Sequence, residues 1–183
     1  ASELLAWNQV EPSTAGGRAA GAMAVAIGRL QGPPQQWNGD AAILPIRELA
    51  EGTWVVETKI DSEPALLKID LAVRQSIISE RFATAAGIVV DGPDNVASRG
   101  VSNRWPSMMS ARQAALMKLE LGTVMVRNIV VAVSDLVDGF DGILGVDVLS
   151  TARWSLNLAD GEMMFSPPEQ AVAADKLSRS FKG

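Results

Sequence analysis

The most informative stretch of this chain is residues 140–149, FDGILGVDVL. In it the apolar pair Ile143 and Leu144 is followed by Gly145, and Asp147 then stands between two valines. We expect Ile143 and Leu144 to fill a core, and Gly145 to allow two backbone segments to cross where a Cβ would collide. The stretch therefore predicts a tight backbone crossing inside a buried β structure.

A second informative stretch, ALLKIDLAVRQSIISERFATAAGI, covers residues 65–88. Its first part, 65–71, is an apolar-rich strand that contains Asp70. Residues 79–86 follow as a short helix, with Ser79 as the N-cap and Gly87 at the stop position. The sequence thus predicts a strand, a turn after Asp70, and one helix among strands.

The surrounding segments also favour β structure. Predicted strands cover residues 42–46, 53–60, 111–121, 124–133 and 141–149, and the turn signal Ala159-Asp160-Gly161 makes 152–165 a hairpin. About ten short strands with one principal helix are typical of an all-β barrel or sandwich. We therefore assign the chain to the all-β class.

Composition excludes several kinds of chemistry. The 183 residues contain no Cys and no His, which removes thiolate nucleophiles, His-dependent triads and His- or Cys-ligated metals. We expect no metal and no cofactor, and any reaction must rest on carboxylates, hydroxyls, Lys or Arg. The formal net charge of −5 argues against a nucleic-acid partner, because phosphate binding needs concentrated positive charge.

The chain divides by composition into three parts. Residues 1–40 are predicted to be an N-terminal arm or linker with a possible short helix at 18–30, residues 41–167 a β domain, and residues 168–183 a C-terminal tail. The longest weakly polar run, 19–28, is about half as long as a bilayer-spanning helix, so we predict no transmembrane segment. The arm and the tail are the segments that we expect to contact protein partners.

These two stretches resemble the retropepsin-like aspartic proteases of bacterial type, over roughly residues 41–167. In that family an apolar strand leads into Asp-Thr-Gly-Ala-Ser, and Asp70 falls at the position of the catalytic aspartate. The second signature of the family is similar to Asp141, Gly142, Ile143, Leu144, Gly145 and Asp147. The resemblance implies a closed retropepsin-like β-barrel with one short helix. It also implies a substrate-covering flap that contains Ser102, Asn103, Arg104 and Trp105, and these four residues together with Arg74 are the candidate binding residues.

The chain departs from this family beside Asp70. Leu71 stands where the family has the Thr or Ser hydroxyl that links the two halves of the active site, and Ala72 adds a Cβ where the family has Gly. Arg74 follows closely, and we expect it to neutralise Asp70 in an ion pair. These departures predict a domain that has lost peptidase activity and acts as a binding or structural subunit of a protein assembly.

Two alternatives stay open at this point. The first is an active homodimeric aspartic endopeptidase, in which Asp70 from each chain completes the site and the substrate is a peptide. The second is a binder of carbohydrate or small ligands in the former cleft. Bacterial proteins that this chain resembles are often exported, and the absence of Cys permits export, so the resemblance implies a periplasmic or otherwise exported protein, with a cytoplasmic location as the alternative.

Overall fold

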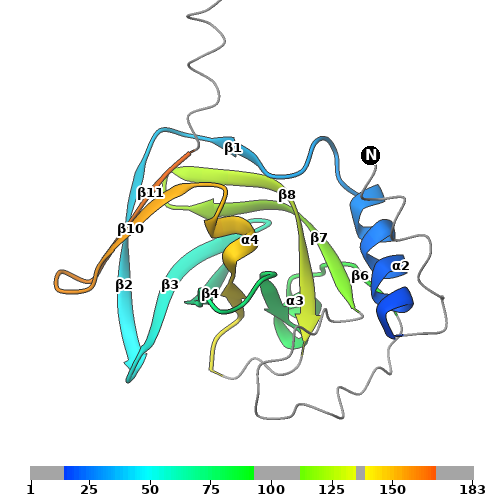
Figure 1. Cartoon of the computed structure of the whole chain (residues 1–183), viewed down its shortest axis with the longest axis horizontal. Coiled ribbons are helices and arrows are strands. Elements are labelled where there is room, and N and C mark those ends of the chain that lie inside the picture. Colours follow the sequence, from blue (N-terminus) through cyan, green and yellow to red (C-terminus); the bar gives the residue numbers. More distant parts are fainter. Residues whose placement is uncertain (1–14, 93–111, 135–138, 168–183) are drawn as a thin grey trace, which may run out of the picture.

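The computed structural model describes residues 15–92, 112–134 and 139–167, and Figure 1 shows them as a barrel of strands with a helix at one side. The strands are β1 (Gln36–Asn38), β2 (Ala42–Ala50), β3 (Thr53–Ile60), β4 (Glu63–Ile69), β5 (Ile77–Ser79), β6 (Val90–Asp91), β7 (Gln113–Leu121), β8 (Val124–Ser134), β9 (Gly142–Leu144), β10 (Arg153–Asn157) and β11 (Glu162–Ser166). The helices are α2 (Ala15–Gly28), α3 (Glu80–Ala85) and α4 (Val146–Leu149).

Six strands close the barrel. Around the ring, β3 pairs with β4, β4 with β9, β9 with β5, β5 with β8, β8 with β7, and β7 returns to β3. The β4–β9 and β5–β8 pairs are parallel, and the other pairs in the ring are antiparallel. The predicted all-β class and the closed barrel are confirmed.

A smaller antiparallel sheet extends from this barrel. The hairpin of β10 and β11 joins β2, which pairs with β11 through residues 42–45 and with β3 through residues 46–50. The hairpin predicted at residues 152–165 is therefore present. Its inner side chains, Met163 and Phe165, are fully buried in the same core as the barrel.

The barrel core follows from alternation along the strands. In β4, for example, Ala65, Leu67 and Ile69 point inward and are buried, while Leu66 and Lys68 point outward and are half-buried. All three inward residues belong to one apolar cluster that runs through both sheets. The outward row of β4 consequently leads to Asp70, the residue directly after the strand.

The segment before β2 packs against the barrel. In α2, Ala22 and Ala26 are buried, and this helix contacts β6, β7 and β8. At its end Arg29 forms a two-bond ion pair with Asp91, with both N–O distances 2.8 Å. Farther on, Trp37 of β1 stacks on Phe165 with ring centroids 6.1 Å apart. Among the described residues, no helix combines the length and apolar character needed to span a bilayer.

The helix predicted after Ser79 is present as α3, where the Phe82 N–H donates to Ser79 Oγ at 3.0 Å.

Two other expectations were wrong. The strand predicted through residue 149 ends at Leu144, because the chain turns at Gly145 and residues 146–149 form α4. Ile143 is only half-buried, since it faces away from the core that its neighbour Leu144 enters.

Candidate functional site

Asp70 opens the loop that joins β4 to β5. Its backbone N–H donates to Leu144 O of β9 at 3.2 Å, and its own carbonyl accepts from the Val73 N–H at 3.3 Å. These bonds place the start of the loop against β9. The Asp70 side chain is only 12% exposed, so its carboxylate must find partners inside the chain.

Both carboxylate oxygens of Asp70 have a partner. The Nζ of Lys68 lies 2.8 Å from Oδ2, and the Ala72 N–H donates to Oδ1 at 3.0 Å. Lys68 reaches Asp70 because residues two apart in an extended chain point to the same side. The arrangement neutralises the carboxylate with a cation from the preceding strand.

The expected ion pair between Asp70 and Arg74 is not formed, and that expectation was wrong. Arg74 is exposed, and the Asp147 N–H binds its backbone carbonyl at 3.1 Å instead. Sequence reasoning missed Lys68, although the alternating pattern of a strand ending at Asp70 was the signal that could have found it. Position 68 lies on the same strand face as the carboxylate, whereas position 74 lies beyond the turn.

Leu71 and Ala72, the two residues that depart from the family pattern, form the exposed tip of this loop. Leu71 is 53% exposed and Ala72 is also exposed. Ala72 still provides its backbone N–H to Asp70. The side chain exposed at position 71, however, is a branched hydrocarbon where the family has a hydroxyl.

The far end of the loop is held by Ser76 and Asp147. The Ser76 hydroxyl donates to Asp147 Oδ1 at 2.7 Å and accepts from the Gly145 N–H at 2.9 Å. The Ser76 N–H reaches both carboxylate oxygens at 2.9 Å, and the Val148 N–H donates to Oδ1 at 2.9 Å. Burial raises the pKa of Asp147 above its ordinary value, and these hydrogen bonds oppose that rise only in part.

A close backbone crossing lies beside this network, at Gly145. A Cβ built on Gly145 would meet Val73 O at 2.8 Å and Ser76 N at 3.0 Å, both backbone atoms. The next residue, Val146, donates its N–H to Val73 O at 2.8 Å. The crossing expected from the sequence is therefore observed, and it fixes the loop after Asp70 against α4.

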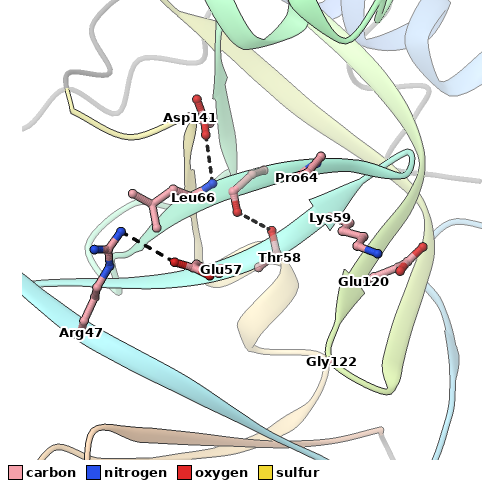
Figure 2. A pocket seen from close by; sticks show the side chains of 10 residues that line it. Arg47, Glu57, Thr58, Lys59, Pro64, Leu66, Glu120, Gly122 and Asp141 are labelled. Carbon is pink, nitrogen blue, oxygen red and sulfur yellow. Dashed lines mark hydrogen bonds and ion pairs between the residues drawn. The ribbon is translucent and has the colours of Figure 1, made fainter.

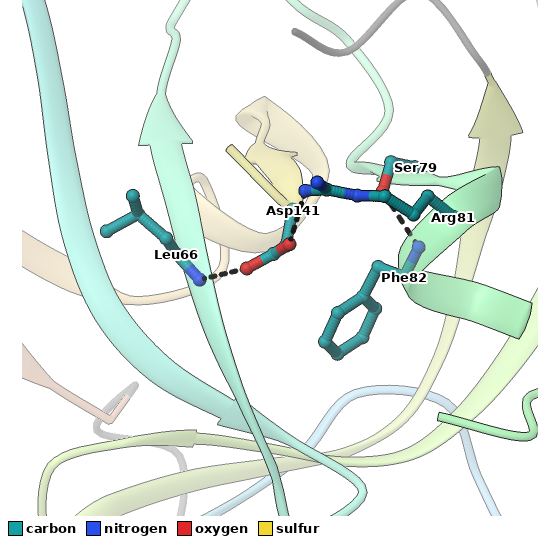
Figure 3. Close-up of polar contacts among 5 residues, drawn as sticks. All are labelled: Leu66, Ser79, Arg81, Phe82 and Asp141. Atoms are coloured by element: carbon teal, nitrogen blue, oxygen red, sulfur yellow. Dashed lines mark hydrogen bonds and ion pairs between the residues drawn. The ribbon is translucent and has the colours of Figure 1, made fainter. Parts of the chain in front are cut away.

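At the other end of β9, Asp141 connects its own segment with β4 and with the segment of Ser79 and Arg81 (Figure 3). Its Oδ2 accepts from the Leu66 N–H at 3.0 Å, and its Oδ1 lies 3.2 Å from Arg81 of α3. Its carbonyl accepts from the Ser79 N–H at 2.8 Å. A Cβ on the neighbouring Gly142 would collide with the carbonyl of Ile77, so this position also needs glycine.

Two open hollows lie elsewhere on the described surface, and neither is lined by Asp70. The first, of about 530 Å³, is bordered by charged residues that include Arg47, Glu57, Lys59 and Glu120 (Figure 2). The second, of about 800 Å³, lies over β7 and β8. The flap residues expected to bind substrate, Ser102, Asn103, Arg104 and Trp105, are outside the described residues.

The barrel, the crossing at Gly145 and the aspartate at the end of β4 define a retropepsin-like domain. The chain belongs to the aspartyl protease family, whose model matches residues 56–148, just over half of the 183 residues. The match begins in β3 and ends in α4, so it contains both Asp70 and Asp147. Among curated protein sequences none matches this chain.

Several solved structures are similar to this chain at low sequence identity. The chain is similar to a retropepsin-like aspartic protease from Rickettsia conorii, with 12% identity, a TM-score of 0.46, and coverage of 75% of this chain and 97% of the other. It is also similar to the retroviral protease-like domain of Ddi1 from Leishmania major, with 18% identity, a TM-score of 0.40, and coverage of 62% and 95%. Basic 7S globulin from soybean matches with 15% identity, a TM-score of 0.36, and coverage of 69% and 42%.

Proposed function

We propose that this chain is a retropepsin-like domain without peptidase activity, which serves as a binding or structural subunit of a protein assembly. The observation that carries the proposal is the engagement of both Asp70 oxygens within the chain, by Lys68 Nζ and by the Ala72 N–H. A catalytic carboxylate instead needs an oxygen that faces a second carboxylate and a water molecule.

The chemistry of the aspartic dyad explains why Lys68 matters. Two carboxylates that share a site hold one proton between them; the ionised one activates water, and the protonated one donates to the scissile carbonyl. A two-fold dimer of this chain would bring two ammonium groups together with the two carboxylates. Each Asp70 would then have its own cation, and the proton-sharing pair would have no electrostatic reason to form.

Leu71 supports the same conclusion. A hydroxyl at this position can hydrogen-bond across the two halves of an aspartic protease site, whereas a leucine side chain cannot. Without that link, an opposed loop has no polar contact at this position to hold its aspartate in place. Errors of about 1 Å in the position of a catalytic group can cost a hundredfold in rate.

The retained scaffold supports a role in binding. The Ser76–Asp147 network and the Gly145 crossing hold the loop in a defined shape. This shape does not depend on peptidase activity. Such a loop offers a partner a rigid surface, and rigid surfaces lose less conformational entropy on association.

A peptidase assay with Asp70→Asn as the control tests this proposal. The wild-type chain and the variant should show the same background cleavage of a mixed peptide library from about pH 3 to pH 7, the range in which aspartic dyads operate. A pepstatin-type inhibitor should leave the melting temperature unchanged, because a ligand that binds the native state would raise it. Inhibitor-sensitive cleavage that disappears in Asp70→Asn would instead establish the active homodimer.

A further inference from the structure

The hollow of about 800 Å³ over β7 and β8, called here the β7–β8 hollow, gathers positive charge. Lys118 of β7, Arg127 of β8 and Arg29 after α2 all line it. Gln31, Gln36 and Asn128 line it as well, and the Asn128 amide donates to Pro33 O at 3.0 Å. Three cations from three segments therefore line one open space in a chain whose net charge is −5.

Two of these cations oppose each other directly. Lys118 and Arg127 are paired residues in the antiparallel register of β7 and β8. Like charges at opposite positions of two strands repel each other and destabilise the pairing. The ion pair of Lys118 with Glu120 already offsets part of this repulsion, and an anion bound at Arg127 would remove the rest.

The acidic residues nearby do not balance Arg127. Glu120 forms an ion pair with Lys118, and Asp91 forms one with Arg29. Asp61 is the one acidic residue among the described residues that line the hollow, and its Oδ1 accepts the Lys118 N–H at 2.7 Å. Within the described part of the chain, the guanidinium of Arg127 forms a hydrogen bond only to Met125 Sδ, from Nε at 3.3 Å, and has no acidic partner.

Unusual backbone conformations are concentrated at the same hollow. The described part of the chain has four non-glycine residues with positive φ, and three of them, Asp61 (50°), Ser62 (84°) and Asn128 (58°), line the hollow. The fourth, Gln35 (52°), donates its N–H to Asn128 O at 3.0 Å. A turn accounts for Asp61 and Ser62. Asn128 lies within β8 in a conformation that asparagine adopts readily, and its side-chain amide donates to Pro33 O at 3.0 Å, which holds the chain before β1 against β8.

Apolar side chains also line the hollow. They include Ile88, Met117 and Val89, and Val89 is 55% exposed. Cations and an exposed valine thus lie around one open space. This combination suits a ligand in which a carboxylate stands next to an apolar group.

We propose that the β7–β8 hollow binds an acidic peptide segment of a partner protein, with a carboxylate held between Arg127 and Lys118 and an apolar side chain against Val89. The site is separate from Asp70, so the proposal holds whether or not the chain cleaves peptides. It identifies the chemistry of a partner by charge complementarity and apolar contact.

Fluorescence anisotropy with two labelled hexapeptides tests this site. One probe alternates Glu and Leu, and the matched probe alternates Gln and Leu. We expect saturable binding of the acidic probe, about tenfold tighter than that of the amide probe, because charge-assisted hydrogen bonds are the stronger ones. Raising the salt concentration should weaken the binding.

Arg127→Gln should weaken binding of the acidic probe by about tenfold, and Val89→Ser by a few-fold. Both positions are exposed, so both variants should keep the wild-type circular dichroism spectrum. Arg47→Gln, an exposed change at the first hollow, is the matched control and should leave binding unchanged. Equal affinity for both probes, or unchanged binding by Arg127→Gln, would overturn the proposal. Displacement of the acidic probe by an equal concentration of inorganic phosphate would also overturn it, because it would reveal a simple anion site.

Discussion

The Ser76 hydroxyl lies 2.7 Å from Asp147 Oδ1 and thereby joins the end of the Asp70 loop to α4. The same oxygen accepts the Gly145 N–H, so both bonds of this hydroxyl tie the loop to one segment that is distant in the sequence, residues 145–147. Ser76 is 5% exposed, and water cannot readily replace either bond. The shape of the loop after Asp70 therefore depends on this hydroxyl.

Replacing Ser76 by alanine should destabilise the fold by about 2 kcal/mol, because the buried Gly145 N–H loses its acceptor and Asp147 loses a donor. Urea unfolding monitored by tryptophan fluorescence measures the change. Ser155→Ala, on the exposed face of β10, is the matched control and should stay within about 0.5 kcal/mol of wild type. A loss at Ser76 no larger than that at Ser155 would show that the hydroxyl does not brace the loop.

Gly145→Ala should destabilise the fold by about 2 kcal/mol or more, because the new Cβ meets backbone atoms that cannot rotate away. The matched control is Gly21→Ala. Gly21 is exposed in α2 with no atom near its missing Cβ, so alanine should stabilise by about 0.5–1 kcal/mol through helix propensity. Thermal unfolding should thus move in opposite directions for the two glycine-to-alanine changes, and a shared direction would contradict the crossing at Gly145.

Much of the fold could be predicted from local patterns. Alternation located β3, β7, β8 and the β10–β11 hairpin, and the capping signal of Ser79 located α3, because each depends on neighbours within a few residues. The helical turn after Gly145 could not be predicted in this way. Val146 and Leu149 are equally suited to a strand, and the backbone contacts with Val73 and Arg74 that favour the turn come from a distant segment.

The candidate site was predictable only in part. The resemblance located Asp70, and the lost hydroxyl at Leu71 was plain from the sequence. The cationic partner of Asp70 could not be identified from the motif, because Arg74 and Lys68 are both close to Asp70 in the sequence and only strand geometry distinguishes them. The β7–β8 hollow depends on cross-strand register and on the position of α2, and neither is encoded in a short motif.

Asp147 should make the stability of the fold depend on pH. Burial raises its folded-state pKa above the ordinary value of 3.8, so the folded protein binds more protons than the unfolded chain between these two pKa values. The contribution of Asp147 is therefore fully present below the ordinary value and is lost as pH rises through the raised one. The stability of the Asp147→Asn variant should not show this fall as pH rises.

Urea unfolding of wild type and Asp147→Asn, in steps from about pH 3.5 to pH 7, measures the effect as a difference between two curves. Other carboxylates titrate in both proteins and largely cancel in this difference. We expect the stability of wild type relative to Asp147→Asn to fall as pH rises. A relative stability that rises with pH would mean that the hydrogen bonds from Ser76 and Val148 outweigh the burial of the carboxylate.

The ion pair of Lys68 and Asp70 should behave as a coupled unit. Lys68→Met leaves a carboxylate that is 12% exposed without its cation, and should cost about 1–2 kcal/mol. Asp70→Asn should cost less, because the longer Lys68 side chain can move its ammonium into solvent. The double variant should be more stable than the sum of the two losses predicts, with a coupling energy of about 1 kcal/mol.

A double-mutant cycle on the exposed pair of Arg47 and Glu57 is the control for the cycle on Lys68 and Asp70. Arg47 Nη2 lies 3.7 Å from Glu57 Oε1, and the two side chains are 60% and 77% exposed. Exposed pairs contribute little, so the coupling in Arg47→Met and Glu57→Gln should be below about 0.3 kcal/mol. Both cycles are measured by urea unfolding at neutral pH and low salt. If the coupling energy of Lys68 and Asp70 were as small as that of Arg47 and Glu57, Asp70 would not be held by Lys68 in solution. Its carboxylate would then be free to face a second Asp70, and the main argument against catalysis would fail.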